Sequence, residues 1–343
     1  MTTNDLQTAI QNAMRAAFPL AEERVAPFFA LQEYHLGWRD QHLRPAVSAP
    51  GKLLRPQFAL LACRAVGGQA EQALPLAAAL QLIHDFSLIH DDIQDQSETR
   101  RGRETVWKLW GIAHGINVGD GMFTVAHLAL HKLSEVGVDP ALALEVLKRF
   151  DQTILTICEG QYLDMSFEGK IEISETDYLA MISRKTAELI AAATGLGALV
   201  GRGNAANVRA MFNFGQSLGL AFQMQDDILG IWGEPEVTGK PFAADLYRRK
   251  VSLPIIHALH NSAQSGELER IYRRRRIREA DVKRALEILG AAGSRQYVET
   301  VAQQYHLEAF QALESVQPGN TALAQGALAQ MHALAEGLLG RQT

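Results

Sequence analysis

Residues 71–95 read EQALPLAAALQLIHDFSLIHDDIQD, and this stretch decides the fold class. Up to residue 90 its apolar residues recur at intervals of three and four, which is the spacing of one face of an α-helix. A second Ala/Leu-rich window, residues 118–135, has the same spacing, and only 11 prolines interrupt the chain. Period-two alternation is scarce, its best example being KIEIS at 170–174. We therefore expect an all-α protein, a single large helical bundle with almost no sheet.

The chain of 343 residues is long enough to bury one large core, and we expect a single domain spanning residues 1–343. Segments rich in glycine and proline predict helix boundaries and not domain linkers. They lie at residues 45–51, 67–68, 137–140, 201–203, 233–241 and 318–319.

Composition limits the partners and the compartment. The net charge of -5, from 33 basic and 38 acidic side chains, leaves no excess of positive charge for phosphates, so we expect no nucleic-acid partner. Cys63 and Cys158 are too few for a disulfide framework or a cysteine zinc site, and we expect both to be core thiols in a reducing compartment. No run of about 18 apolar residues occurs, so we expect no membrane span and a cytoplasmic protein.

Asp91, Asp92 and Asp95 end the first helical stretch, and the four-residue step from Asp91 to Asp95 places these two carboxylates on one helix face. Three carboxylates beside an apolar surface repel one another and resist desolvation unless a cation neutralises them. All-oxygen ligands from few side chains favour magnesium, and the spacing lacks the EF-hand loop that holds calcium. For this cluster taken alone, a solvated acidic helix face is the alternative.

A second apolar helix, LAFQMQDDILGIWG at residues 220–233, carries Asp226 and Asp227. The repeated pair favours a shared metal site, because a bundle could bring the second pair opposite the first across a central cavity. Di-iron proteins also place carboxylates in a bundle, but they need Glu-x-x-His pairs. No glutamate in this chain has a histidine three residues later, so we reject that interpretation.

Basic residues that could bind phosphates lie near both clusters. Arg100 and Arg101 follow the first cluster directly in SETRRGRETVW at residues 97–107. The others are Lys52 and Arg55 in GKLLRP, Lys185 in RKT, and Lys240 and Lys250 after the second cluster. No G-x-x-x-x-G-K-[ST] loop occurs, so nucleoside triphosphate binding by a P-loop is not predicted. The dense basic run at residues 273–276 is expected to be a solvated helix end or loop without a catalytic part.

In order and spacing, GKLLRP, LIHDDIQD, RRG, FQMQDDILG and GK resemble the motifs of the trans-isoprenyl diphosphate synthases, also called polyprenyl synthetases. The resemblance covers roughly residues 50–255, with weaker family-like features in INVGD, EGQYLD and KVSLP. These weaker features include Asn117, Asp120, Glu159, Gln161 and Asp164. The resemblance implies the isoprenoid synthase type I fold, in which the helical bundle surrounds a central cavity, and a homodimer.

The resemblance also implies a magnesium-dependent enzyme that joins isopentenyl diphosphate to an allylic diphosphate such as dimethylallyl, geranyl or farnesyl diphosphate. Its implied catalytic set is Asp91, Asp92, Asp95, Lys185, Asp226 and Asp227. Within that set Asp91, Asp95 and Asp226 would ligate magnesium, and Asp92 and Asp227 would support them. The allylic diphosphate would be bound by Arg100, Lys185, Lys240 and Lys250, and isopentenyl diphosphate by Lys52, Arg55, His84 and Arg101. Thr186 and Gln223 would line the reacting carbons.

His84 has a second interpretation, because a lone histidine on an apolar helix face is usually a core residue. The implied chemistry passes through a carbocation: cations stabilise the departing diphosphate, and the isopentenyl double bond attacks the allylic carbon. The released diphosphate then removes the proton. A dry, aliphatic interior is needed because water would quench the carbocation.

Product length should depend on Phe86 and Ser87, which lie five and four residues before Asp91 and would point down the elongation cavity. In the resembling enzymes an aromatic residue there with a small neighbour suggests geranylgeranyl diphosphate as product, and farnesyl diphosphate is the alternative. Phe86 can also be a simple core aromatic. One departure from the family pattern is Gly230, which stands where many members have a third aspartate. We expect weaker support for the metal there, with catalysis retained.

Two other functions compete with this one. A terpene cyclase shares the first aspartate motif, but it does not need GKLLRP and RRG to hold a second diphosphate. A noncatalytic subunit of a heteromeric synthase is the other alternative, and Gly230 keeps it open, although the remaining aspartates and Lys185 are intact.

Overall fold

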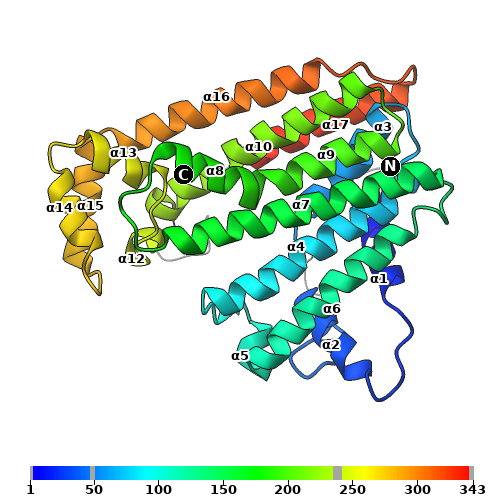
Figure 1. The fold of residues 1–343 in the computed structure, drawn as a ribbon, viewed down its shortest axis with the longest axis horizontal. Coiled ribbons are helices and arrows are strands. Elements are labelled where there is room, and N and C mark those ends of the chain that lie inside the picture. The colour runs from blue at the N-terminus through cyan, green and yellow to red at the C-terminus, as the bar shows by residue number, and fades with distance from the viewer. Residues whose placement is uncertain (1–2, 47–50, 235–241, 340–343) are drawn as a thin grey trace. The chain divides into compact units, whose positions relative to one another are not determined.

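The computed structural model describes residues 3–46, 51–234 and 242–339 (Figure 1). Its first half contains α1 (Thr3–Ala17), α2 (Ala26–His35), α3 (Leu54–Ala65), the 3-10 helix η1 (Ala70–Ala73), α4 (Leu74–Gln94), β1 (Thr99–Arg100), β2 (Arg103–Glu104), α5 (Val106–Trp110), α6 (Ile112–His131) and α7 (Pro140–Phe167). Then follow α8 (Glu175–Ile182), the π-helical turn η2 (Ser183–Ala187), α9 (Glu188–Val200), α10 (Ala205–Trp232), α12 (Ala244–Tyr247), α13 (Leu253–Asn261), α14 (Ser265–Tyr272), α15 (Glu279–Ala291), α16 (Ser294–Glu314) and α17 (Ala322–Leu339). The all-α prediction is confirmed.

The chain divides into two compact units, each built from three segments. Unit 1 consists of Met1–Phe150, Ala193–Val208 and Pro318–Leu328, and unit 2 of Asp151–Ala192, Arg209–Gln317 and Ala329–Thr343. The chain passes between the units within four helices, α7, α9, α10 and α17, and once in the loop between α16 and α17. A single domain over residues 1–343 stays a prediction.

In unit 1, α4 is the central helix. It packs along α6, and also against α1 and α3 (Figure 1). Leu76, Leu80 and Ile83 are almost completely buried in this core. Burial of such aliphatic side chains stabilises the unit by about 1.5–3 kcal/mol for each one. The buried part of α4 therefore fixes the last turn of the helix, which carries the first aspartate cluster.

In unit 2, α13 packs on α16, and α14 and α15 add to the same apolar core. Met224, Ile228 and Ile231 of α10 are buried in this core at intervals of three and four residues. The face of α10 that carries Asp226 is half-buried beside that stripe. The dense basic run at 273–276 begins where α14 ends, as predicted for a solvated helix end, and its side chains are exposed.

One described helix, Ala70–Gln94, is long and apolar enough to cross a membrane by length and composition alone. In the structure 67% of its apolar window is buried inside the protein. Since the core helix of a globular domain passes the same test, this helix is weak support for a membrane span.

The expectation of almost no sheet is confirmed, and one local prediction, for Cys158, was wrong. KIEIS at 170–174 forms no strand but leads to Ser174, the N-cap of α8, whose hydroxyl accepts a hydrogen bond from the Asp177 amide. The named strands in the described part of the chain are the two-residue β1 and β2. Cys63 is a core thiol, whereas Cys158 is exposed, because it lies on α7 in line with Leu155 and Tyr162, which are also exposed.

Candidate active site

The end of α4 separates the three aspartates of the first cluster. Asp91 is half-buried and Asp95, the C-cap residue, is exposed, and the two lie one turn apart. Asp92 is 2% exposed and forms an ion pair with Arg100. The expected crowding of three carboxylates is therefore wrong for Asp92, because a guanidinium already neutralises it. Asp91 and Asp95 remain as the candidates to bind a cation.

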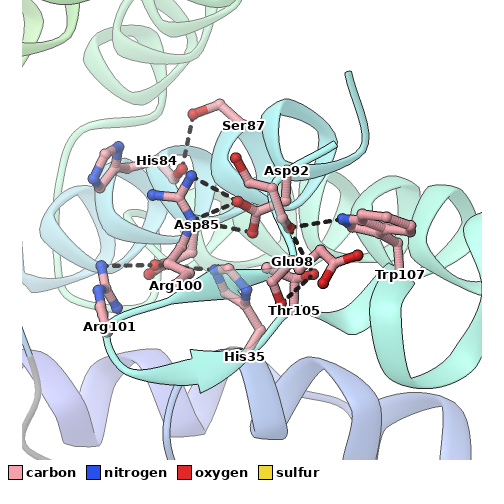
Figure 2. A network of polar contacts seen from close by, with 11 residues as sticks. His35, His84, Asp85, Ser87, Asp92, Glu98, Arg100, Arg101, Thr105 and Trp107 are labelled. Carbon is pink, nitrogen blue, oxygen red and sulfur yellow. Dashed lines mark hydrogen bonds and ion pairs between the residues drawn. The ribbon is translucent and has the colours of Figure 1, made fainter. Parts of the chain in front are cut away.

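A short antiparallel hairpin formed by β1 and β2 positions Arg100. Its Nε donates to both carboxylate oxygens of Asp92, at 2.9 and 3.0 Å, and Nη2 lies 2.8 Å from Oδ1 (Figure 2). The Trp107 indole and the Thr105 hydroxyl each donate to the Ser97 carbonyl at 2.9 Å, which fixes the hairpin against the end of α4. The tight bidentate pair holds Arg100 in one orientation next to the aspartate motif.

Sequence reasoning missed Asp85, which is 1% exposed and lies seven residues before Asp92 on the same face of α4. Its Oδ2 accepts a hydrogen bond from Gln81 Nε2 at 2.8 Å. Its Oδ1 lies 3.5 Å from His35 Nε2 and 3.6 Å from Arg101 Nη2 (Figure 2). The seven-residue spacing of Asp85 and Asp92 is the sequence signal that could have found it.

Most of the residues assigned to isopentenyl diphosphate lie around Asp85. Burial lowers the pKa of Arg55 to about 10, while the Asp85 charge acts in the opposite direction. Burial, followed by the Arg55 charge, holds the pKa of His84 well below its usual range, so its imidazole is neutral near pH 7. The Arg101 guanidinium also approaches the loop that carries Lys52: a Cβ at Gly51 would lie 3.6 Å from Arg101 Nη2.

In unit 2, Lys185 and Thr186 lie on the π-helical turn η2. Such turns are rare and are frequent at functional sites. A Cβ at Gly160 of α7 would lie 2.3 Å from the Lys185 nitrogen, so glycine permits the close approach of α7 to this turn. Lys185 forms an ion pair with Asp164 of α7. Asp164, a weaker family-like feature of the sequence, thus orients one of the predicted cations.

A continuous polar chain joins most of the other residues predicted in unit 2. Thr186 Oγ1 donates to Gln223 Oε1 at 2.8 Å, and Gln223 Nε2 donates to Asp227 Oδ1 at 3.1 Å. Lys250 Nζ donates to the same oxygen at 2.9 Å. The Tyr178 hydroxyl donates to the other oxygen, Oδ2. Asp227 is fully buried at the centre of this network.

The network explains how a buried carboxylate and a partly exposed ammonium are paired. Burial lowers the pKa of Lys250, but the Asp227 and Asp245 charges outweigh it and raise the pKa well above its usual range. Burial and the Asp227 charge raise the pKa of Tyr178, which therefore stays protonated and donates. Tyr178, which sequence reasoning missed, left no spacing signal, since its partner Asp227 lies 49 residues away.

In both aspartate pairs the first and the second residue differ in burial and in their contacts. The second residue of each pair, Asp92 or Asp227, is buried and binds a cation of the protein. The first residue, Asp91 or Asp226, is half-buried. Asp92 and Asp227 therefore orient cations, and Asp91, Asp95 and Asp226 are the better candidates for metal ligands.

The second motif has glycine in place of a third aspartate, and a carboxylate from another helix lies beside this glycine. A Cβ at Gly230 would lie 2.2 Å from Asp245 Oδ2, and the same oxygen is 3.8 Å from Lys250 Nζ. Asp245 of α12, 15 residues further along the chain, thus fills the place beside Gly230. The sequence did not indicate this residue, because it lies on another helix, 15 residues from Gly230.

The predicted chain-length residue Phe86 begins a row of rings in unit 1 that meet edge to face or tilted. Its ring centroid lies 4.8 Å from that of His90 and 5.4 Å from that of Phe123 on α6. The row continues from Phe123 to His127 at 4.6 Å and from His127 to Phe150 at 5.5 Å. Ser87 is small, and its hydroxyl donates to the His84 carbonyl at 2.8 Å.

The chemistry of these donors fits magnesium. Asp91, Asp95 and Asp226 offer only carboxylate oxygens, the ligand type that magnesium prefers. Among the described residues no group of three or more His, Cys, Asp or Glu side chains gathers to hold a metal. Magnesium needs no such group when one or two carboxylates are completed by water and substrate phosphates.

Two expectations stay untested. The placement of Asp226 opposite Asp91 across a central cavity stays a prediction, because Asp91 belongs to unit 1 and Asp226 to unit 2. Lys240, predicted to bind the allylic diphosphate, lies outside the described residues.

Comparison with known proteins agrees with the motifs. The profile of the family described as "Polyprenyl synthetase" matches residues 37–289. The chain is 40% identical over 269 residues to a geranylgeranyl diphosphate synthase of Mycobacterium tuberculosis, covering 78% of this chain and 76% of the relative. It is 39% identical over 233 residues to a (2E,6E)-farnesyl diphosphate synthase of Mycobacterium bovis, covering 68% of this chain and 64% of the relative.

The fold agrees as well. A polyprenyl synthetase from Streptomyces coelicolor A3(2), known from its crystal structure, superposes with a TM-score of 0.88 at 33% identity and covers 98% of both chains. The matched residues 37–289 include every residue assigned above to catalysis, substrate binding or chain length. This chain therefore belongs to the polyprenyl synthetase family.

Proposed function

We propose that the chain is a magnesium-dependent trans-prenyltransferase that joins isopentenyl diphosphate to an allylic diphosphate and releases geranylgeranyl diphosphate. One observation carries the proposal. Two adjacent arginines of one hairpin, Arg100 and Arg101, pair with separate buried carboxylates, and Arg101 lies in a second basic set with Arg55 and His84. Arginines held by two different carboxylates suit a reaction with two diphosphate substrates, whereas a cyclase binds one diphosphate.

In the proposed reaction the protein supplies charge and shape. Asp91, Asp95 and Asp226 would hold magnesium, which, when bound, stabilises negative charge on the allylic diphosphate as the bond between carbon and oxygen breaks. Arg100 would face the same diphosphate in the orientation that Asp92 fixes. The leaving diphosphate takes the bonding electron pair, the isopentenyl double bond forms the new carbon–carbon bond, and a proton is lost from the isopentenyl unit to the released diphosphate.

The residues that would bind isopentenyl diphosphate are not the proposed metal ligands. Arg55, Arg101 and Lys52 would neutralise its charge, and the neutral His84 would donate one hydrogen bond. In unit 2, Lys185 and Lys250 would bind the allylic diphosphate, each already oriented by an aspartate. No side-chain nucleophile takes part.

Phe86 supports geranylgeranyl diphosphate as the product, because its ring contacts that of Phe123 and would close the elongation cavity. Farnesyl diphosphate is the second candidate, since a large ring so close to the aspartates would also suit a shorter product. Both products are short-chain prenyl diphosphates, so the class of reaction does not depend on this choice.

We further propose that both units act together as one domain in a cytoplasmic homodimer, with Asp226 facing Asp91. Ile112 and Ile116, one turn apart on α6, expose 55% and 46% of their surface, which supports a contact between two copies. Light scattering of the purified protein would give the mass of a dimer, and the mass of a monomer would refute this part of the proposal.

The function is tested by incubating the protein with isopentenyl diphosphate and, separately, dimethylallyl, geranyl or farnesyl diphosphate. Products are identified by mass spectrometry with magnesium present and with a chelator in its place. A linear prenyl diphosphate that forms only with magnesium is the expected result. A cyclic hydrocarbon would indicate a cyclase, and failure of the folded protein to elongate any primer would favour the noncatalytic subunit.

A further inference from the structure

The α4 helix presents acidic residues on two faces. Asp91 and Asp95 lie on one face at the end of the helix, whereas Asp85 and Asp92 lie on the other, 1% and 2% exposed. Asp85 and Asp92 are seven residues apart, which brings them two turns apart along one side of the helix. They face Arg101 and Arg100, two consecutive residues of the hairpin (Figure 2).

We propose that Asp85 is a positioning residue for isopentenyl diphosphate, acting through Arg101, while Asp92 acts through Arg100 on the other diphosphate. The assignment rests on the proposed function, which gives Arg101 to isopentenyl diphosphate and Arg100 to the allylic substrate. Asp85 does not touch substrate. It holds the guanidinium that does.

The contacts of Asp85 indicate a carboxylate that is held in place and carries a charge. Gln81 and His35 approach it from α4 and α2, and burial alone would raise its pKa. The facing His35 imidazole, with the charge of Arg101, instead holds the pKa of Asp85 well below its usual range. Asp85 is therefore ionised at any pH at which the enzyme would work.

The contact between Asp85 and Arg101 leaves the guanidinium able to bind a second anion. At 3.6 Å it is looser than the bidentate pair of Asp92 and Arg100, and the Arg101 side chain is 42% exposed. A guanidinium has five N–H donors, so one loose carboxylate contact leaves donors for a phosphate. A cavity of about 330 Å³ beside the hairpin is lined in part by His35, Arg100 and Arg101.

The backbone of Arg101 also argues for a side chain kept for function. Its φ of 53° lies in the left-handed region, in a turn where glycine, asparagine or aspartate would be favoured. A residue with a Cβ is less stable than glycine in this region, because the Cβ crowds the neighbouring carbonyl oxygen. Strain of this kind is typical of residues held in place for binding.

The experiment compares Asp85→Asn with its matched control Asp92→Asn. Isopentenyl diphosphate binding is measured by calorimetry without magnesium or allylic substrate, and KM is then measured for each substrate. Loss of one charge-assisted contact should raise the Kd and KM of Asp85→Asn for isopentenyl diphosphate about tenfold, with the allylic KM unchanged within about twofold. Asp92→Asn should raise the allylic KM and leave the isopentenyl diphosphate Kd unchanged.

A double-mutant cycle separates positioning from general destabilisation. If Asp85 acts through Arg101, Asp85→Asn should have little further effect on the Kd in an Arg101→Gln background. A purely structural Asp85 would weaken binding equally in both backgrounds. Should Asp85→Asn not fold, Gln81→Met disturbs Asp85 without a change of charge and should raise the Kd about threefold.

The outcomes distinguish this inference from the proposed function. If the wild-type protein neither binds isopentenyl diphosphate nor elongates a primer, the proposed function fails and the inference falls with it. If the wild type binds and elongates but Asp85→Asn and Gln81→Met retain its Kd, the inference alone is refuted. Equal effects of Asp85→Asn on both substrates would refute it as well.

Discussion

The carboxylate of Asp245 occupies the space that a side chain at Gly230 would need, since a Cβ there would lie 2.2 Å from Asp245 Oδ2. The same carboxylate oxygen lies 3.8 Å from Lys250 Nζ, which also binds Asp227. The absence of a side chain at Gly230 therefore leaves the space that the buried Asp245 carboxylate occupies. The motif has one aspartate fewer on α10, and a carboxylate from α12 approaches the same lysine.

We expect Gly230→Ala to lower the free energy of unfolding by about 1–3 kcal/mol, because the methyl group must displace Asp245 from a packed site. Prenyl transfer should also fall, since Lys250 loses part of its support. Urea denaturation and steady-state kinetics on the same preparation would measure both effects.

The control is the double variant Gly230→Ala with Asp245→Ala, in which the clash is removed. The double variant should be more stable than the sum of the two single changes implies. Gly230→Asp should not increase activity. An active Gly230→Asp enzyme, more stable than the wild type, would contradict the arrangement described for Asp245.

Adjacent aspartates of the second motif should respond differently to the same substitution. Asp227→Asn removes the fully buried charge that Lys250 and Tyr178 bind and should cost about 2 kcal/mol of stability. Asp226→Asn removes a half-buried carboxylate outside that network and should cost less than about 1 kcal/mol, although it should reduce turnover strongly. Chemical denaturation without magnesium measures the difference, and equal losses of stability would be inconsistent with the separate roles.

The fold class could be predicted from the sequence because helical periodicity is local. Most of the window at residues 71–90 lies in α4, the predicted breakers at 67–68 and 201–203 fall between helices, and the one at 137–140 ends at the first residue of α7. Burial was predicted less well: Cys158 lies on an apolar stripe of α7 that stays exposed in the single chain. Periodicity shows which residues share a face, but not what covers that face.

For the candidate site, the sequence identified residues with a strong motif and missed those that support them. Asp91 and Asp226 stand in repeated acidic pairs and Asp95 follows the first pair by one turn, whereas Asp85, Tyr178 and Asp245 stand alone. Tyr178 and Asp227 are 49 residues apart in sequence and meet only through tertiary packing. Partners of this kind carry no fixed spacing, which is why only Asp85, on the same helix as Asp92, left a readable signal.

The lowered pKa of His84 gives a pH-dependent stability. Burial and the Arg55 charge keep the folded imidazole neutral, so between the folded pKa and about 6.5 the unfolded chain binds more protons. Stability therefore rises with pH in that window and is lost as the pH falls through it. Between pH 7.5 and 5.5 the wild type should lose about 1 kcal/mol more than His84→Gln.

Denaturation at several pH values measures this difference, and substitution of the exposed His42 is the matched control. If wild type and His84→Gln lose equal stability between pH 7.5 and 5.5, His84 is not held neutral by its surroundings. Its assignment as a neutral hydrogen-bond donor to isopentenyl diphosphate would then be wrong.

The row of rings from Phe86 to Phe150 predicts how product length responds to substitution. Phe86→Ala should lengthen the product by one or two isoprene units, because it removes the first ring and leaves Phe123, 5.4 Å away, as the next obstacle. The double variant Phe86→Ala with Phe123→Ala should lengthen it further, and Phe29→Ala on α2 serves as a control for the loss of an aromatic ring elsewhere in unit 1. Mass spectrometry of the prenyl diphosphates gives the chain lengths. If Phe86→Ala retains the wild-type product profile, Phe86 is a core aromatic and the end of the elongation cavity lies elsewhere.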